Sequence, residues 1–365
     1  MKISCPGSRL PVPGVRSTIV ALAWIVAASP TSAAVTLRGI VPEDGPRSGW
    51  FERYTEARQG PEQIDKVSQT FKVGEGASLD VSHLSGDIRV TGTSGSEIKV
   101  EATKRARSRD AAEAKRQLDE LRIDINNFNG RVEVRTIYPR RSSNGNGLSV
   151  SVDYVIAVPV NATVSLKSIS GDISVTNVKG EVSAQTVSGD VNLSETPNAV
   201  IAKTISGDVT ARDVGSTTTL VLGTVSGTVL GTGLRVRALE AGSVSGDVRL
   251  IASQIERLEA KSVSGNIEFD APLSRSGRYE FLSHSGNVRI LLSGNTGFEL
   301  DADTFSGSVR SDVPVTLQSA ARPDQHRTGD RRGSGSNRAI RGSYGDASAF
   351  LSIRSHSGSV VIAKK

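Results

Sequence analysis

Apolar and polar residues alternate over short stretches along most of the chain, and the alternation returns at a nearly constant spacing. Residues 185–193 read QTVSGDVNL, and a Ser-Gly pair flanked by apolar positions recurs ten times. The glycines of these pairs are Gly86, Gly171, Gly189, Gly207, Gly227, Gly246, Gly265, Gly286, Gly307 and Gly358. From Gly171 to Gly307 they lie 18 to 21 residues apart. A fixed period of this length indicates stacked structural repeats.

The pattern around each glycine predicts two short strands that meet at a corner. Val182 and Ala184 precede Gly189, and Val191 and Leu193 follow it. Residues two apart point to the same side of a strand, so these four side chains are expected to face inward. By the same spacing we expect Val187 and Gly189 to face inward too, after a slip in parity next to Thr186. The Ser-Gly-x triplet is therefore interpreted as a structural corner, with glycine where the wall bends closely.

One repeat cannot bury its own apolar face, but stacked repeats can. The sequence therefore predicts an all-β fold, a β-solenoid of about eight to nine stacked coils of 18–21 residues, or a close relative with two facing sheets. A stack of eight coils rises about 38 Å at the usual spacing between strands. A β-rich capping domain with one short helix is expected to precede it.

The remaining composition divides the chain into segments. We expect a signal peptide at residues 1–34, a polar linker at 35–66, the capping domain at 67–160 with its helix at about 109–121, and the repeat domain at 161–365. Asp110 and Glu113 have the spacing of a helix capping box. An Arg/Gly/Ser-rich loop at about 318–347 is expected to be inserted into the repeats.

The first 34 residues predict export. Basic residues precede an apolar run at positions 19–28, and small residues suited to cleavage follow it. Cys5, the chain's one cysteine, lies within this segment, so the mature chain is expected to fold without disulfides. Periplasm, cell surface and extracellular space remain open as locations. No transmembrane anchor is expected, because no segment has the roughly 20 apolar residues that a span needs.

Three features together resemble a known family. They are the opening strand LDVSHLSGDIRV at residues 79–90, the step YVIAVP at 154–159, and the tandem Ser-Gly-Asp-Val coils. The chain resembles the bacterial putative-adhesin family of secreted β-repeat proteins, a domain of unknown function, over roughly residues 67–362. The resemblance implies an exported or envelope-exposed bacterial protein, and it brings no catalytic residues to carry over.

The residues themselves indicate no catalytic or cofactor site. The sequence has neither a Gly-x-Ser-x-Gly elbow nor a phosphate-binding Gly-x-x-x-x-Gly-Lys loop. His83 occupies the Ser/Thr position of its repeat, and His284 and His356 occupy the apolar position before the serine. Phe305 fills the same position in another repeat, so these three rings are expected to stack. His326 lies alone in the arginine-rich loop.

Aspartate follows the glycine in half of the repeats. Asp172, Asp190 and Asp208 would stack about 5 Å apart, where a bound cation could relieve their repulsion. The alternative is a row of splayed, hydrated carboxylates.

The chain carries a net charge of +6, and the excess positive charge of the mature chain lies in one loop, residues 321–341, which holds six arginines and two aspartates. The candidate contacts for an anionic ligand are Arg322, Arg327, Arg331, Arg332, Arg338 and Arg341. The alternative is a solvated Gly/Ser-rich loop without a ligand. No specific nucleic-acid partner is expected.

These observations favour a non-enzymatic, exported cell-envelope protein that acts in surface binding or scaffolding, in an adhesin-like manner. Its partner is an unknown surface ligand: a glycan, an envelope component or a protein. Two alternatives remain open: a carbohydrate-active β-helix enzyme, and an envelope signalling or stress-response component that acts through a partner protein. We expect a monomer whose last strand, residues 359–365, is an exposed edge guarded by Lys364 and Lys365.

Overall fold

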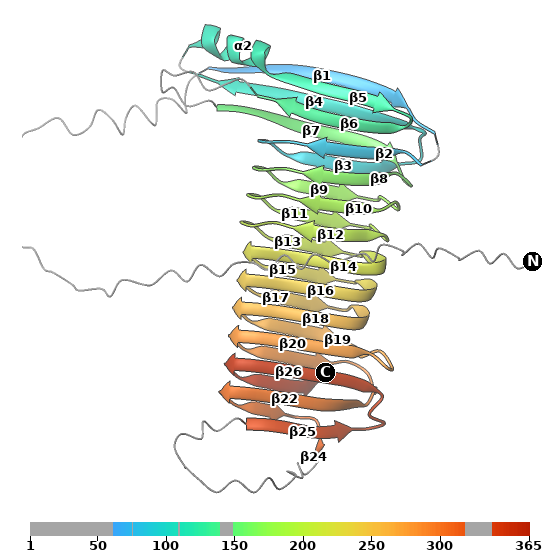
Figure 1. Ribbon diagram of the computed structural model, residues 1–365, viewed down its shortest axis with the longest axis vertical. Coiled ribbons are helices and arrows are strands. Elements are labelled where there is room, and N and C mark those ends of the chain that lie inside the picture. Colours follow the sequence, from blue (N-terminus) through green and yellow to red (C-terminus); the bar gives the residue numbers. More distant parts are fainter. Residues whose placement is uncertain (1–60, 75, 109, 139–148, 318–337) are drawn as a thin grey trace, which may run out of the picture. The chain divides into compact units, whose positions relative to one another are not determined.

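The computed structural model describes residues 61–74, 76–108, 110–138, 149–317 and 338–365, which lie in one compact unit, Gly49–Lys365. They form two long sheets, and each repeat contributes one strand to each sheet (Figure 1). Sheet A has thirteen strands, in the order β1 (Glu62–Lys72), β4 (Glu97–Arg107), β7 (Ser149–Pro159), β3 (Ile88–Thr93), β9 (Ile173–Thr176), β11 (Val191–Ser194), β13 (Val209–Arg212), β15 (Val229–Thr232), β17 (Val248–Ile251), β19 (Ile267–Ala271), β21 (Val288–Leu292), β27 (Val360–Lys364) and β23 (Val309–Ser311).

Sheet B has fourteen strands, in the order β24 (Thr316–Leu317), β25 (Arg338–Tyr344), β22 (Phe298–Ser306), β26 (Ala349–Ser357), β20 (Arg278–Ser285), β18 (Gln254–Ser264), β16 (Arg235–Ser245), β14 (Gly215–Ser226), β12 (Ala199–Lys203), β10 (Val182–Gln185), β8 (Thr163–Lys167), β2 (Ser78–Ser82), β6 (Arg131–Ile137) and β5 (Arg122–Phe128). The predicted all-β solenoid is confirmed as two facing, mostly parallel sheets.

Alternation along each strand builds the core. In β10, Val182 and Ala184 are buried, and in β11 of the same coil Val191 and Leu193 are buried. Parallel register places like residues beside one another, so Val191 pairs with Ile173 of the coil before and with Val209 of the coil after. Burying such columns of aliphatic side chains contributes roughly 25 cal/mol per Å² of apolar surface removed from water. The core is therefore continuous from coil to coil.

The predicted capping region continues the two sheets. Strands β2 and β3 form the first coil. Strand β1, which precedes them in the chain, and β4 and β7, which follow them, extend sheet A, and β5 and β6 extend sheet B. Helix α2 (Ala111–Glu120) begins at its N-cap Asp110, whose side chain accepts the Ala112 N–H, and it contacts β1 and β4 through its buried Ala114 and Leu118. The linker predicted at residues 35–66 is too long at its C-terminal end, because β1 already begins at Glu62.

The last coil along the chain is not the last coil in the stack. Strand β26 lies between β20 and β22 in sheet B, and β27 lies between β21 and β23 in sheet A (Figure 1). The expectation that residues 359–365 form an exposed edge strand is therefore wrong. Lys364 donates to the Asn295 side chain (2.9 Å), and Lys365 pairs with Asp270 (2.9 Å), so neither lysine guards an edge.

Short strands end the stack on the side of the last coils, whereas the edge strands at the other end, β1 and β5, have eleven and seven residues. Edge strand β23 has three residues, and edge strand β24 has two. Such short edges offer few free backbone groups to another chain. The inserted loop predicted at residues 318–347 is also too long, because its C-terminal part forms β25, which pairs antiparallel with β22.

The position of the last coil generates a prediction. Deleting residues 349–365 removes β26 and β27 and leaves β22 and β23 without their parallel partners. We expect amide hydrogen exchange to accelerate in β22 and β25 as well as in β20 and β21, because the gap lies inside the stack. Loss of protection confined to β20 and β21 would contradict this strand order.

Candidate functional site

The corner between the two sheets is the one feature that every coil shares, and its glycine is required by stacking. Gly189 has a φ of +133°, which favours glycine, and a Cβ on it would lie 2.3 Å from the carbonyl oxygen of Gly171. A Cβ on Gly207 would likewise lie 2.2 Å from the carbonyl oxygen of Gly189. The contact that excludes a side chain at the corner is thus with the backbone of the neighbouring coil.

A column of buried hydroxyl groups closes the inner side of the corner. The Thr204 hydroxyl donates to the Gly189 carbonyl (2.9 Å), and the Thr224 hydroxyl donates to the Gly207 carbonyl (2.9 Å). Ser243 repeats the contact with Gly227, also at 2.9 Å. These bonds satisfy carbonyl groups that the turn would otherwise leave buried without a partner.

A column of carboxylates lies on the outer side of the corner and bonds to the backbone. The Asp190 N–H donates to Oδ1 of Asp172 (2.8 Å), and the Asp208 N–H donates to Oδ1 of Asp190 (2.8 Å). The Thr228 N–H continues the series on Asp208 (2.7 Å). The candidate cation ladder thus has a structural use, and the described residues hold no group of three or more His, Cys, Asp or Glu that could bind a metal.

The apolar residue before each serine faces solvent. The expectation that Val187 points inward is wrong, because the chain turns between Thr186, which is buried, and Val191. Six consecutive positions of this column are between 36% and 50% exposed: Leu84, Ile169, Val187, Ile205, Val225 and Val244. Core packing therefore does not explain why these positions are aliphatic. We call this row, with the residues that continue it, the corner column.

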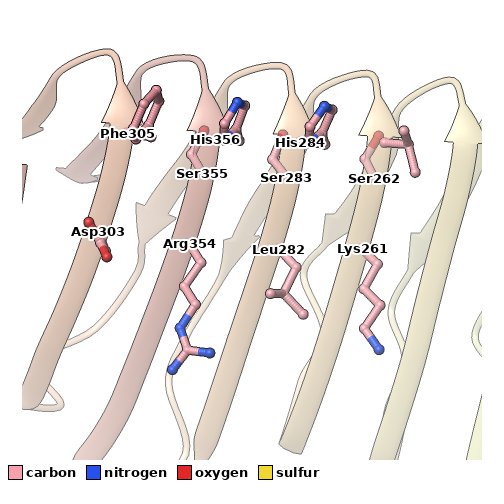
Figure 2. Close-up of a pocket in the computed structure, with 11 residues that line it drawn as sticks. Lys261, Ser262, Leu282, Ser283, His284, Asp303, Phe305, Arg354, Ser355 and His356 are labelled. Carbon is pink, nitrogen blue, oxygen red and sulfur yellow. The ribbon is translucent and has the colours of Figure 1, made fainter. Parts of the chain in front are cut away.

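The corner column changes to aromatic residues at its far end. The rings of His284 and His356 stack at 4.8 Å, and those of His356 and Phe305 stack at 5.0 Å, nearly parallel in both cases. The predicted aromatic stack is confirmed, with His356 in the middle because its coil lies between the other two. Figure 2 shows the three side chains beside the corners, with Asp303, Arg354, Leu282 and Lys261 in a second row on the same strands.

A shallow hollow of about 420 Å³ lies over these two rows. Its lining comes from β18, β20, β26 and β22: Lys261, Ser262, Val263, Leu282, Ser283, His284, Asp303, Phe305, Arg354, Ser355 and His356. The register places Leu282 opposite both Lys261 and Arg354, and Asp303 opposite Arg354. The sequence indicated the ring column of this site but not the charged row beside it.

His83 departs from the hydroxyl column of the other coils and belongs to a buried polar cluster. Its Nδ1 lies 3.2 Å from the Thr136 hydroxyl, which is 2.7 Å from the Tyr154 hydroxyl. The Tyr138 hydroxyl donates to the Ser85 carbonyl at 3.0 Å. Desolvation lowers the pKa of His83 to about 4 and raises the pKa of Tyr154 to about 12. Sequence reasoning found the position of His83 but missed its partners.

The predicted anionic-ligand contacts lie mostly outside the described residues, namely Arg322, Arg327, Arg331 and Arg332. Arg338 begins β25, and the Arg341 guanidinium pairs with Asp301 (3.1 Å). His326 and the predicted signal peptide also lie outside the described part. Within that part, no helix has the length and apolarity to cross a membrane.

Comparison with known proteins agrees with the resemblance seen in the sequence. The family model described as Toastrack DUF4097 matches residues 75–292 and 196–362. No curated protein matches the chain significantly.

Three solved structures are similar to the chain. A "putative cell adhesion protein" from Clostridium sporogenes is 11% identical, over 83% of this chain and 100% of its own, with a TM-score of 0.20. A "putative adhesin" from Bacteroides fragilis is 11% identical over 82% and 97%, with a TM-score of 0.37. A "putative lipid binding protein" from Parabacteroides distasonis is 10% identical over 82% and 97%, with a TM-score of 0.35.

The corner geometry predicts unequal effects at adjacent positions. Gly189→Ala places a Cβ against a backbone oxygen at a positive φ, and we expect it to lower the free energy of unfolding by about 3 kcal/mol or more. Asp190→Ala removes one bond to a backbone N–H and should cost about 1 kcal/mol, whereas Asp190→Asn keeps the acceptor and should cost less. Urea unfolding measures all three. Equal losses at Gly189 and Asp190 would refute the stacking argument.

The low pKa of His83 predicts a pH-dependent stability. The folded state disfavours the imidazolium, so the stability is complete above about pH 6.5 and falls as the pH drops toward 4. Between pH 8 and pH 5, where most carboxylates stay ionised, this histidine should lower the free energy of unfolding by about 2 kcal/mol. His83→Thr restores the residue type of the other coils and should flatten the dependence in urea titrations. A profile that keeps its slope in this variant would show that other groups cause it.

Proposed function

We propose that this chain, which belongs to the Toastrack DUF4097 family, is an exported, non-enzymatic binding protein of the bacterial cell envelope with an adhesin-like role. The observation that carries the proposal is the corner column. One exposed aliphatic side chain in each of six consecutive coils forms a continuous apolar row. The corner does not require these side chains, because the close contact between coils is made by the glycine backbone. Contiguous exposed apolar surface on a stable fold marks a place of contact with a partner.

The rows beside the corner column give this surface an amphipathic character. On sheet B the neighbouring outward row contains Lys167, Gln185 and Lys203 on adjacent strands, and it continues to Lys261. Apolar contact area next to mobile cations suits an extended ligand that is bound along the coils rather than enclosed. Gln185, Gly223 and Gly242 separate the lysines of this row, whereas the apolar row beside it is unbroken over six coils, so its length supports multivalent binding of one long ligand.

A carbohydrate-active enzyme would need a different arrangement. Glycoside hydrolysis uses two carboxyl groups that flank the scissile bond. Among its described lining residues, the hollow at the end of the corner column holds one carboxylate, Asp303, which lies opposite Arg354. A binding role accounts for this composition without a second acid.

The proposal predicts that the corner column binds ligand and does not cut it. Ile169→Ser combined with Ile205→Ser should leave the fold intact, because both side chains are half exposed, and should weaken binding to an array of bacterial envelope glycans about tenfold. Ile64→Ser combined with Val155→Ser removes exposed aliphatic residues from sheet A and is the matched control.

Three results would contradict parts of the proposal. Equal binding by the Ile169/Ile205 variant and the parent would remove the corner column as the contact surface. Release of shortened glycans during incubation would contradict the non-enzymatic role. Resistance of the protein to protease added to intact cells, together with its absence from a periplasmic extract, would contradict export.

A further inference from the structure

The residue after the corner glycine loses its charge at one end of the stack. It is aspartate in the coils of Gly86, Gly171, Gly189, Gly207 and Gly246. In the last four coils of the stack the same position is held by Asn266, Asn287, Ser359 and Ser308.

The backbone hydrogen bond persists where the charge is lost. The Asn287 N–H donates to Oδ1 of Asn266 (3.1 Å), and the Ser359 N–H donates to Oδ1 of Asn287 (3.0 Å). Asp247, one coil earlier, accepts the Asn266 N–H in the same way at 2.9 Å. An amide oxygen and a carboxylate oxygen thus do the same structural work. The corner does not explain why the carboxylates are absent from these coils.

The coils without carboxylates are the coils that form the hollow. His284 and His356 replace aliphatic residues in the corner column there, and Lys261 and Arg354 stand in the next row (Figure 2). Asp303, opposite Arg354, is the acid among the lining residues, and Glu259, Glu280 and Asp301 form the next outward row, where Glu259 pairs with Lys261. Two cations therefore stand against one carboxylate in the lining itself, and the absence of corner carboxylates makes the potential there less negative than at the earlier corners.

We propose that this hollow binds the oxyanion groups of an anionic polysaccharide: carboxylate, sulfate or phosphate groups carried on a sugar chain. The inference rests on the proposed binding function and names the chemistry of one part of its surface. Arg354 and Lys261 supply charge-assisted donors, and Leu282 between them supplies apolar contact for the sugar backbone. The imidazole rings stack on one another, so their N–H edges rather than their faces are available to a ligand.

A sugar chain fits this corner better than a membrane surface does. A flat anionic bilayer along the corner would meet the aspartates of the earlier coils, among them Asp172, Asp190 and Asp208. A flexible chain can lie over the last four coils alone. The hollow is concave, which also suits a chain that enters it rather than a flat surface.

The decisive variant adds a charge without disturbing the corner. Asn287→Asp introduces the residue that five other coils already carry and keeps the acceptor for the Ser359 N–H. Binding of the full chain to dextran sulfate and to polygalacturonate, with neutral dextran as the blank, should fall about fivefold in this variant, and the urea midpoint should not change. Lys261→Gln should weaken binding by a similar factor, whereas Lys72→Gln, at an exposed lysine of β1 in sheet A, should not.

The two histidines provide an independent test. His284→Ala combined with His356→Ala removes the ring edges that face the hollow and should weaken binding to both polyanions about threefold, without a change in the urea midpoint. Polyanion binding that is unchanged in both the Asn287 and the histidine variants would overturn the inference.

Two further outcomes separate this inference from the proposed function. Binding to neutral envelope glycans without binding to either polyanion would refute the anionic site and leave the proposed function standing. If the parent protein binds neither the neutral glycans nor the polyanions, both the anionic site and the proposed function are refuted. Vesicles of phosphatidylcholine with phosphatidylglycerol test an anionic membrane as the ligand. If the protein binds these vesicles but neither polyanion, the inference of a polysaccharide site is also overturned.

Discussion

The whole fold depends on the close approach of one corner backbone to the next. From Gly171 onward, each corner glycine lies against the carbonyl group of the glycine in the neighbouring coil, at a distance that leaves no room for a Cβ, and Gly86 lies in the same way against the carbonyl group of Val152. Isolated bridges between successive serines, such as Ser170 with Ser188, hold the same register. Because this contact fixes both the spacing and the register of the coils, like residues are forced into columns, and each column can specialise.

The columns differ in what they tolerate. The hydroxyl column is buried and most of its members bond to corner carbonyls, although the Ser168 and Ser355 hydroxyl groups have no such bond. It holds small hydroxyl residues except at His83, which has its own polar partners. The column after the glycine needs an acceptor for a backbone N–H but not a charge, and aspartate and asparagine both serve. The corner column has no structural requirement beyond solvent exposure. Freedom from structural constraint is greatest on this outer surface, where residues can be selected for contact with a ligand.

Much of this architecture could be predicted from the sequence, because it is periodic and local. The spacing of the glycines gave the coils, and the alternation around Gly189 gave the inward residues of both strands. The direction of Val187 was predicted wrongly, since two-residue periodicity fails within a corner. The partners of His83 and the pairing of Arg341 with Asp301 depend on contacts between segments far apart in the chain. No local pattern records such contacts.

The order of the last coils links the assembly of the stack to the proposed site. Strand β26 enters between β20 and β22, which precede it in the chain, so the two halves of the hollow meet only when the C-terminal segment is in place. Without that segment, β18 and β20 would carry Lys261 and His284, but Arg354 and His356 would be missing between them and Phe305. Closing contacts of long sequence separation is slow, and it comes late when the intervening coils must form first. The charged row and the ring stack are therefore completed together by one insertion. A chain that lacks its last coil would keep most of its repeats and lose the surface on which the anionic ligand is proposed to bind.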